Sequence, residues 1–157
     1  DAAGLRKLQS ALEERGVEVG LAARVLPLDV GLVGHLAGAL VGRVSDDDLE
    51  RRFRDAPCVL AVAHDEDYGL TAIEAMRHGR PVIVCTDGGG LTELVVHEQT
   101  GLVVDPTPRA VADAIERLVT DRDLAAELGR NGRDRAAEFS WANAVAEFRD
   151  GLERVDR

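Results

Sequence analysis

The chain has 157 residues, a length that fits one domain with a single buried core. Its 19 Lys and Arg residues against 29 Asp and Glu residues leave a formal net charge of −10. Nucleic acids and anionic membranes bind proteins through basic surfaces, so this balance of charge excludes both as expected partners. Aromatic residues make up 3% of the chain, too few to form a platform for stacking bases.

Two cysteines, Cys58 and Cys85, lie in separate apolar runs and lack the spacing of metal ligands. We expect both thiols to be buried, reduced and slow to react, as in a protein of the cytoplasm. No uncharged apolar stretch of the sequence is long enough to cross a bilayer, so we expect no integral membrane segment.

The pattern of apolar residues predicts alternating helices and strands, beginning with a helix that carries a leucine stripe over residues 2–15. Residues 17–28 are ambiguous, and a short buried strand is expected at residues 39–44. Ser45 is expected to cap a helix whose first turn holds the carboxylates of residues 46–48, because anions stabilise the positive end of the helix dipole.

Three apolar runs in the middle of the chain are typical of strands buried on both faces of a parallel sheet. They cover residues 58–63, residues 81–85 and Gly101–Val104, with a short helix over residues 71–78 between the first two. Three helices are expected in the last third, starting at Thr107-Pro108, at Asp121 and after Ser140. The alternation predicts an α/β fold with a Rossmann-like, doubly wound parallel sheet, the strands at 58–63 and 81–85 being central.

Ligands of an open parallel sheet bind beyond the carboxyl ends of its strands, and two loops in that position stand out. Residues 64–71 follow the first of these strands and hold three consecutive acids at 65–67. Residues 86–93 follow the next strand and hold three consecutive glycines, which predict a tight turn and close backbone approach rather than a phosphate cradle. His64 is expected to be a surface or hydrogen-bonded histidine rather than an acid–base group, and Glu93 either contacts a ligand or braces its loop.

The start of the short helix is a candidate phosphate site. The backbone N–H groups of residues 70–72 follow Gly69 and are expected to be free, and free amides at a helix N-terminus bind phosphate. The nearby carboxylates repel a phosphate, but they are good acceptors for hydroxyl groups on either side of it. Glu74 lies one helical turn after Leu70 and shares this edge. The layout, with phosphate in the middle and hydroxyls on both sides, predicts a nucleotide-sugar.

The stretch EDYGLTAIEAM, from Glu66 to Met76, resembles the hallmark of retaining glycosyltransferases of the GT-B fold, group 1 or family 4. That hallmark is a Glu, seven residues and a second Glu, around a Phe/Tyr-Gly-Leu centre. Further segments resemble the family in the same order and spacing, and together they cover about residues 40–152. They are GRVS at 42–45, GRPVIV at 79–84, DGGGLTE at 87–93, TGLVV at 100–104 and FSW at 139–141.

The resemblance implies that residues 1–157 are one donor-binding domain, the C-terminal half of a GT-B fold. The implied reaction transfers a hexose-type sugar from a UDP- or GDP-sugar to an acceptor hydroxyl with retention, without a metal or another cofactor. By position, Glu66 would contact the hydroxyls of the transferred sugar as the catalytic candidate, and Glu74 would hold the ribose. The remaining implied contacts are the backbone of Gly69, Leu70 and Thr71 with the diphosphate, and Arg43 and Val44 with the base.

Two features of the family are missing from the sequence. The family's C-terminal domain opens with a strand, a Gly-Arg loop and a Lys-Gly helix start whose cations neutralise the diphosphate, whereas the one lysine here, Lys7, lies within an expected helix. The N-terminal acceptor domain is also absent. We therefore expect this chain to be the donor-binding half of a longer protein, with the other half as its partner, and to be inactive by itself.

Several alternatives stay open at this point. A sugar-nucleotide epimerase related to GT-B enzymes and a non-catalytic domain for nucleotide binding or interaction both fit the same residues. Glu66 and Glu74 are also compatible with solvated surface acids. A metal site at residues 65–67 is disfavoured, because consecutive carboxylates rarely converge on one ion. A phosphoacceptor receiver domain and a pyridoxal-phosphate phosphorylase both need a lysine that these strand ends lack.

Overall fold

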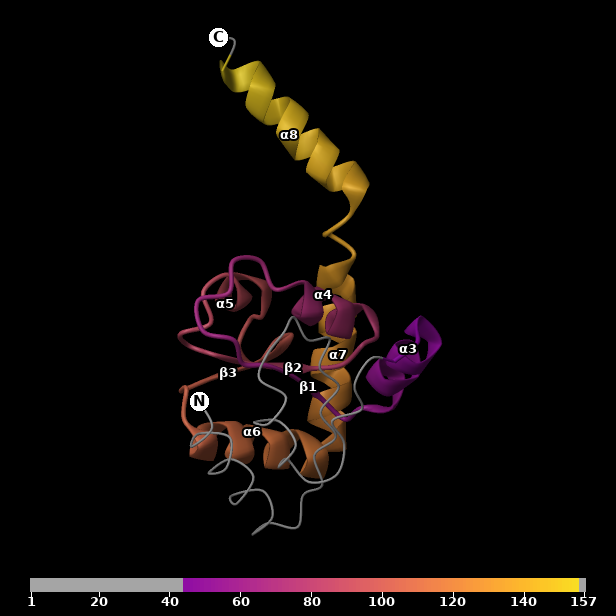
Figure 1. The fold of residues 1–157 in the computed structure, drawn as a ribbon, viewed down its shortest axis with the longest axis vertical. Helices are drawn as coiled ribbons and strands as arrows, with labels where there is room; N and C mark the ends of the chain where they lie inside the picture. The colour runs from indigo at the N-terminus through magenta and orange to yellow at the C-terminus, as the bar shows by residue number, and fades with distance from the viewer. Residues whose placement is uncertain (1–43, 156–157) are drawn as a thin grey trace.

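The structure is a computed structural model and describes residues 44–155. The features expected at residues 2–15 and 17–28 lie outside this range, as do Arg43 and all but the last residue of the strand expected at 39–44. The elements in chain order are α3 (Asp46–Asp55), β1 (Val59–Ala61), α4 (Leu70–Arg77), β2 (Val82–Cys85), α5 (Leu91–Leu94), β3 (Gly101–Val104), α6 (Pro108–Thr120), α7 (Arg122–Ala136) and α8 (Trp141–Val155) (Figure 1).

The described strands form one parallel sheet in the order β1-β2-β3. Ile83 on the central strand β2 is in register with Leu60 of β1 and Leu102 of β3. Among residues 44–155, β1 lies at an edge of the sheet, so of the two strands predicted to be central only β2 is central in this part of the chain. The predicted run at 58–63 was too long, because the chain leaves the sheet at Val62, which is 41% exposed.

Helices cover both faces of the sheet, as the prediction of a doubly wound fold requires (Figure 1). Side chains of β2 alternate between the faces, which is the period of a strand. Ile83 and Cys85 pack in one core cluster with the apolar side of α6, and Val82 and Val84 pack in the other with α4 and α5. All residues of β2 are buried, so the strand reads as one continuous apolar run.

The helix starts follow the capping residues that the sequence predicts. Each cap side chain accepts a hydrogen bond from the backbone N–H three residues later, which satisfies an amide that the helix leaves unpaired. The distances are 3.2 Å for Ser45, 3.2 Å for Thr107, 2.9 Å for Asp121 and 3.2 Å for Ser140. Two described helices start at glycines without a side-chain cap: α5 follows Gly90, and α4 begins at Leu70 rather than Thr71, after Gly69 in the left-handed conformation.

The packing of α4 against α7 depends on small residues of α7. A Cβ atom at Gly129 would overlap the carbonyl oxygen of Gly79, just beyond the end of α4. A Cβ atom at Gly132 would lie 3.2 Å from Cγ of Met76, which is itself fully buried. The two glycines therefore let α7 approach closely enough to cover the helix that carries the candidate site.

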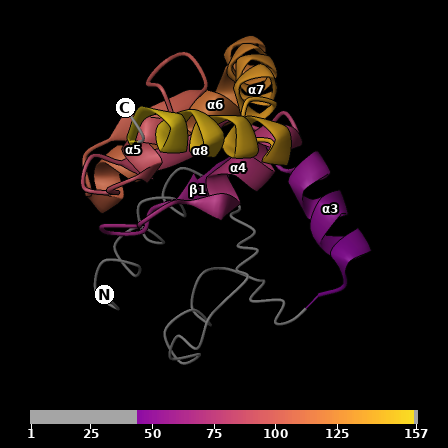
Figure 2. The ribbon, with the colours of Figure 1, turned by 90° about the horizontal axis from the view of Figure 1, so that it is seen from above.

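The last helix, α8, extends away from the sheet in Figure 1 and lies nearest the viewer in Figure 2. Four of its large apolar side chains are more than half exposed. They are Trp141, Val145, Phe148 and Leu152. This helix therefore adds little to the core of the described part. No helix within residues 44–155 has both the length and the apolar character needed to cross a membrane.

The two thiols are free and shielded from water. Cys85 is 4% exposed, and Cys58 is half-buried just before β1, less covered than predicted because it precedes the strand. Burial raises the pKa of Cys58 to about 11. Burial also raises the pKa of Cys85, with a smaller contribution from the negative charge of Asp87.

We expect both thiols to react slowly in the folded protein, because the thiolate is the nucleophile and a raised pKa lowers its fraction. With a pKa of about 11 for Cys58 against an ordinary value of about 8.5, the thiolate fraction at pH 8 falls by roughly two orders of magnitude. Labelling with a thiol reagent in native buffer and in denaturant measures the ratio of the two reaction rates. A native rate close to the denatured one would contradict the burial of both side chains.

Candidate functional site

The loops after β1 and β2 lie together at the carboxyl edge of the sheet and are joined through their backbones. The N–H of Asp65 donates to the carbonyl of Asp87 at 2.9 Å, and the N–H of Gly90 donates to the carbonyl of Glu66 at 2.8 Å. Between these bonds, Glu66 and Gly89 form a parallel β-bridge. We call residues 64–67 and 87–90, joined in this way, the loop clasp.

Glycine is required where the two loops touch. Gly89 has a φ of +58°, which favours glycine, and a Cβ atom there would lie 2.8 Å from the Glu66 carbonyl oxygen. A Cβ atom at Gly90 would lie 2.5 Å from the carbonyl oxygen of Asp67. The tight turn and close backbone approach that the sequence predicts are therefore confirmed.

A side-chain contact also spans the loop clasp. His64 Nδ1 lies 3.2 Å from Asp87 Oδ2, and the His64 side chain is 81% exposed. This fits the prediction of a surface or hydrogen-bonded histidine. The contact leaves the other ring nitrogen, Nε2, as the remaining polar atom of the imidazole.

The N-terminus of α4 opens next to the loop clasp. Gly69 is its N-cap with a φ of 82°, and a Cβ atom there would lie 2.5 Å from Cδ2 of the buried Leu91. One prediction was wrong here: the N–H of Ala72 is not free but donates to the carbonyl of Gly69 at 3.0 Å. The helix has no acceptor for the amides of its first residues, Leu70 and Thr71, and both residues are exposed.

The two candidate glutamates belong to different elements around this helix start. Glu66 is exposed on the loop clasp, whereas Glu74 is half-buried one turn into α4, four residues after Leu70. Val44 is half-buried and directly precedes the Ser45 cap of α3. The place of Arg43 and Val44 beside a base stays a prediction, as do the roles of the two glutamates.

Arg135 of α7 is a supporting residue that the sequence analysis missed. Its Nε donates to the carbonyl of Leu94 and its Nη2 donates to the carbonyl of Glu93, both at 2.7 Å. A guanidinium at the end of α5 satisfies carbonyls that the helix leaves unpaired. The partners are about forty residues apart in the chain, so no local pattern reveals the contact. It braces the main chain of Glu93, while the Glu93 side chain stays exposed.

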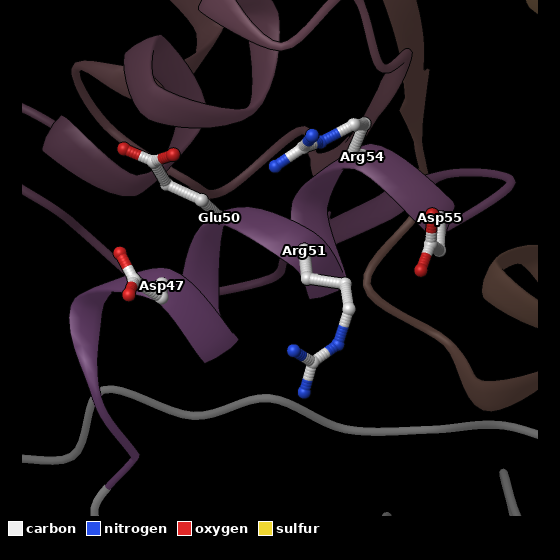
Figure 3. Close-up of a pocket in the computed structure, with 5 residues that line it drawn as sticks. All are labelled: Asp47, Glu50, Arg51, Arg54 and Asp55. Atoms are coloured by element: carbon white, nitrogen blue, oxygen red, sulfur yellow. The ribbon is translucent and has the colours of Figure 1, made fainter.

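One hollow, of about 470 Å³, lies elsewhere on the described surface. It is lined by charged side chains that all come from α3, with the guanidiniums of Arg51 and Arg54 on opposite sides of the helix (Figure 3). Both views place α3 on the side of the molecule opposite α5 (Figure 1 and Figure 2). The hollow is therefore not part of the loop clasp. Within residues 44–155, no group of three His, Cys, Asp or Glu side chains is arranged to hold a metal ion.

A parallel sheet with helices on both faces and polar loops at its carboxyl edge defines a Rossmann-like domain. Residues 39–135 match the family described as glycosyl transferases group 1, so this chain belongs to that family. The fold is accordingly that of the C-terminal half of a GT-B glycosyltransferase.

Relatives and solved structures agree with this family. A glycosyltransferase of Methanocaldococcus jannaschii, named as uncharacterized, is 31% identical over 117 residues, which are 74% of this chain and 33% of the relative. A D-inositol 3-phosphate glycosyltransferase of Gordonia bronchialis is 40% identical over 96 residues, 59% of this chain and 20% of the relative. The structure of a sucrose-phosphate synthase from Thermosynechococcus elongatus is similar with a TM-score of 0.63 and 40% identity, covering 73% of this chain and 29% of that one. The chain thus spans about a third or less of each of these proteins.

Proposed function

We propose that this chain is the donor-binding domain of a retaining glycosyltransferase, which transfers a hexose-type sugar from a UDP- or GDP-sugar to an acceptor hydroxyl. The observation that carries the proposal is the N-terminus of α4, where the amides of two exposed residues have no acceptor within the helix and lie beside the loop clasp that bears Glu66. The names of the relatives, among them a D-inositol 3-phosphate glycosyltransferase and a sucrose-phosphate synthase, support glycosyl transfer. Retention of configuration rests on the resemblance of the motif from Glu66 to Met76.

Three parts of a nucleotide-sugar, namely the diphosphate, the transferred sugar and the ribose, have a chemically matched group at this edge. The amides of Leu70 and Thr71 donate to the diphosphate, and the positive end of the α4 dipole favours its negative charge. Carboxylates accept hydrogen bonds from hydroxyls, so Glu66 holds the transferred sugar and Glu74 holds the ribose. Asp65 and Asp67 add negative charge close to the diphosphate, which weakens binding unless cations from elsewhere oppose it.

The test separates the two glutamates by ligand, in the full-length protein. Glu74→Ala is expected to weaken both the free nucleoside diphosphate and the nucleotide-sugar, because the ribose is common to both. Glu66→Ala is expected to weaken only the nucleotide-sugar. Removing a charged hydrogen-bond partner costs about 1.5–3 kcal/mol, a loss of roughly ten- to a hundredfold in affinity measured by calorimetry.

The matched control is Glu147→Ala, which removes an exposed carboxylate on α8, and it is expected to change neither affinity. If both site variants lose affinity equally for the nucleoside diphosphate and for the nucleotide-sugar, the assigned roles of the two glutamates are wrong. Unchanged binding in both variants would reject the site altogether.

A further inference from the structure

The backbone around Glu66 is placed by contacts with the second loop rather than by burial of its own side chains. Every residue from 62 to 68 is exposed, so the loop after β1 buries no side chain that anchors it. Its fixed points are the hydrogen bonds that join Asp65 to Asp87 and Glu66 to Gly90, at 2.9 and 2.8 Å. The position of the Glu66 backbone, from which its side chain extends, therefore follows from the position of residues 87–90.

The second loop is the anchored half of the loop clasp. It follows β2, whose residues are all buried, and it leads into α5, whose Leu91 is 1% exposed. The N–H of the buried Gly88 donates to the carbonyl of Cys85 at 3.0 Å and closes the turn. Arg135 holds the other end of α5 through the carbonyls of Glu93 and Leu94. The second loop is thus fixed at both ends, and the loop that bears Glu66 is held against it by the backbone hydrogen bonds.

The fit between the loops leaves no space for a side chain. Cβ atoms at Gly89 and Gly90 would lie 2.8 and 2.5 Å from carbonyl oxygens of residues 66 and 67. These neighbours are main-chain atoms, which cannot rotate away as a flexible side chain can. A methyl group at either glycine must therefore displace the peptide groups around Glu66.

We propose that Gly89 and Gly90 are positioning residues that set Glu66 for the sugar part of the donor, an inference that rests on the proposed function. The contact between His64 and Asp87 supports the same placement from the side chains, at 3.2 Å. The start of α4 does not depend on the clasp in this way, because its own residues Ala72, Ile73, Ala75 and Met76 are buried. A substitution in the loop clasp is therefore expected to lower the affinity for the nucleotide-sugar and to leave the affinity for the nucleoside diphosphate unchanged.

The experiment compares Gly90→Ala with Gly151→Ala in the full-length protein. A Cβ atom at Gly151 on α8 meets nothing within 4 Å, so the control adds the same methyl group without a clash. Affinities for UDP, GDP, UDP-glucose and GDP-mannose are measured by calorimetry. We expect Gly90→Ala to weaken whichever nucleotide-sugar binds by about tenfold or more, the loss of one hydrogen-bonded contact, and to leave the matching diphosphate within about twofold. Gly151→Ala is expected to bind as the wild type does.

A second variant keeps the test decisive if Gly90→Ala does not fold. Asp87→Ala removes the contact with His64 without adding bulk, and it is expected to weaken the nucleotide-sugar by about two- to fivefold, the value of an exposed pair. Hydrogen exchange in the wild-type protein tests the loop clasp without any ligand. The N–H of Asp65 is expected to be protected in the wild type and exposed in the glycine variant, while the N–H of Ala72 stays protected in both.

Three results would overturn the inference. The first is an unprotected Asp65 amide in the wild type. The second is a folded Gly90→Ala variant that binds the nucleotide-sugar as Gly151→Ala does. The third is a Gly90→Ala variant that loses affinity equally for the nucleotide-sugar and for the nucleoside diphosphate. The variant Glu66→Ala separates this inference from the proposed function. If Glu66→Ala binds the nucleotide-sugar normally, the proposed role of Glu66 is wrong. If Glu66→Ala loses affinity for the nucleotide-sugar alone while Gly90→Ala binds it normally, only the positioning role of the glycines is rejected.

Discussion

The 157-residue chain, expressed by itself, is expected to bind nucleotide-sugars no more tightly than about millimolar and to transfer no sugar. Transfer needs donor and acceptor held at reacting distance, and positioning of this kind supplies about 7–11 kcal/mol of barrier lowering. In the proposed function the acceptor is held by a domain outside this chain, so that contribution is lost. Folding is still expected, because the chain is long enough for one core and its helices are well capped.

Weak binding follows from the charges at the candidate site. The loops at 62–70 and 86–93 contain no lysine or arginine, while residues 65–67 are all acidic. An affinity of about millimolar corresponds to about 4 kcal/mol, which one unopposed charge beside the diphosphate can remove.

The measurement is a titration of the chain with UDP- and GDP-sugars by NMR, together with an assay of turnover against a blank without protein. The full-length protein is the control, and it is expected to bind the nucleotide-sugar much more tightly and to show turnover. Micromolar binding by the chain, or turnover above the blank, would show that the site is more complete than we propose.

Met76→Ala is expected to destabilise the protein by about 2–5 kcal/mol, the range for truncating a fully buried large apolar side chain. Met76 is 0% exposed and lies between the sheet and α7, packed in the cluster that contains Val82, Val84 and Ala136. Loss of the side chain leaves a cavity beneath α4, because Gly132 opposite offers no side chain to fill it. The free energy of unfolding comes from urea titration followed by circular dichroism.

Leu152→Ala is the matched control, since it truncates a comparably large apolar side chain that is 53% exposed on α8. Its expected cost is below about 1 kcal/mol. A similar loss in the two variants would mean that α8 is as well packed as α4, contrary to the structure.

The local features of this domain follow from the order of its residues. Ser45, Thr107, Asp121 and Ser140 each begin a helix where the sequence predicts one, because a cap acts within three residues of itself. The runs that became β2 and β3 are apolar without alternation, which is typical of strands covered on both faces. The glycines at 88–90 and the acids at 65–67 also identified the two loops of the candidate site from the sequence, because each of these signals lies within its own loop.

Other features depend on contacts between distant parts of the chain. The sequence does not reveal that residues 87–90 hold Glu66, that Arg135 caps α5, or that Gly129 lets α7 approach α4, because these partners lie some twenty to fifty residues apart. The length of β1 and the bond from Ala72 to Gly69 were mispredicted because apolar pattern does not say where a chain leaves a sheet or how a helix start closes. Such features depend on which backbones meet, and only packing of the whole domain brings those backbones together.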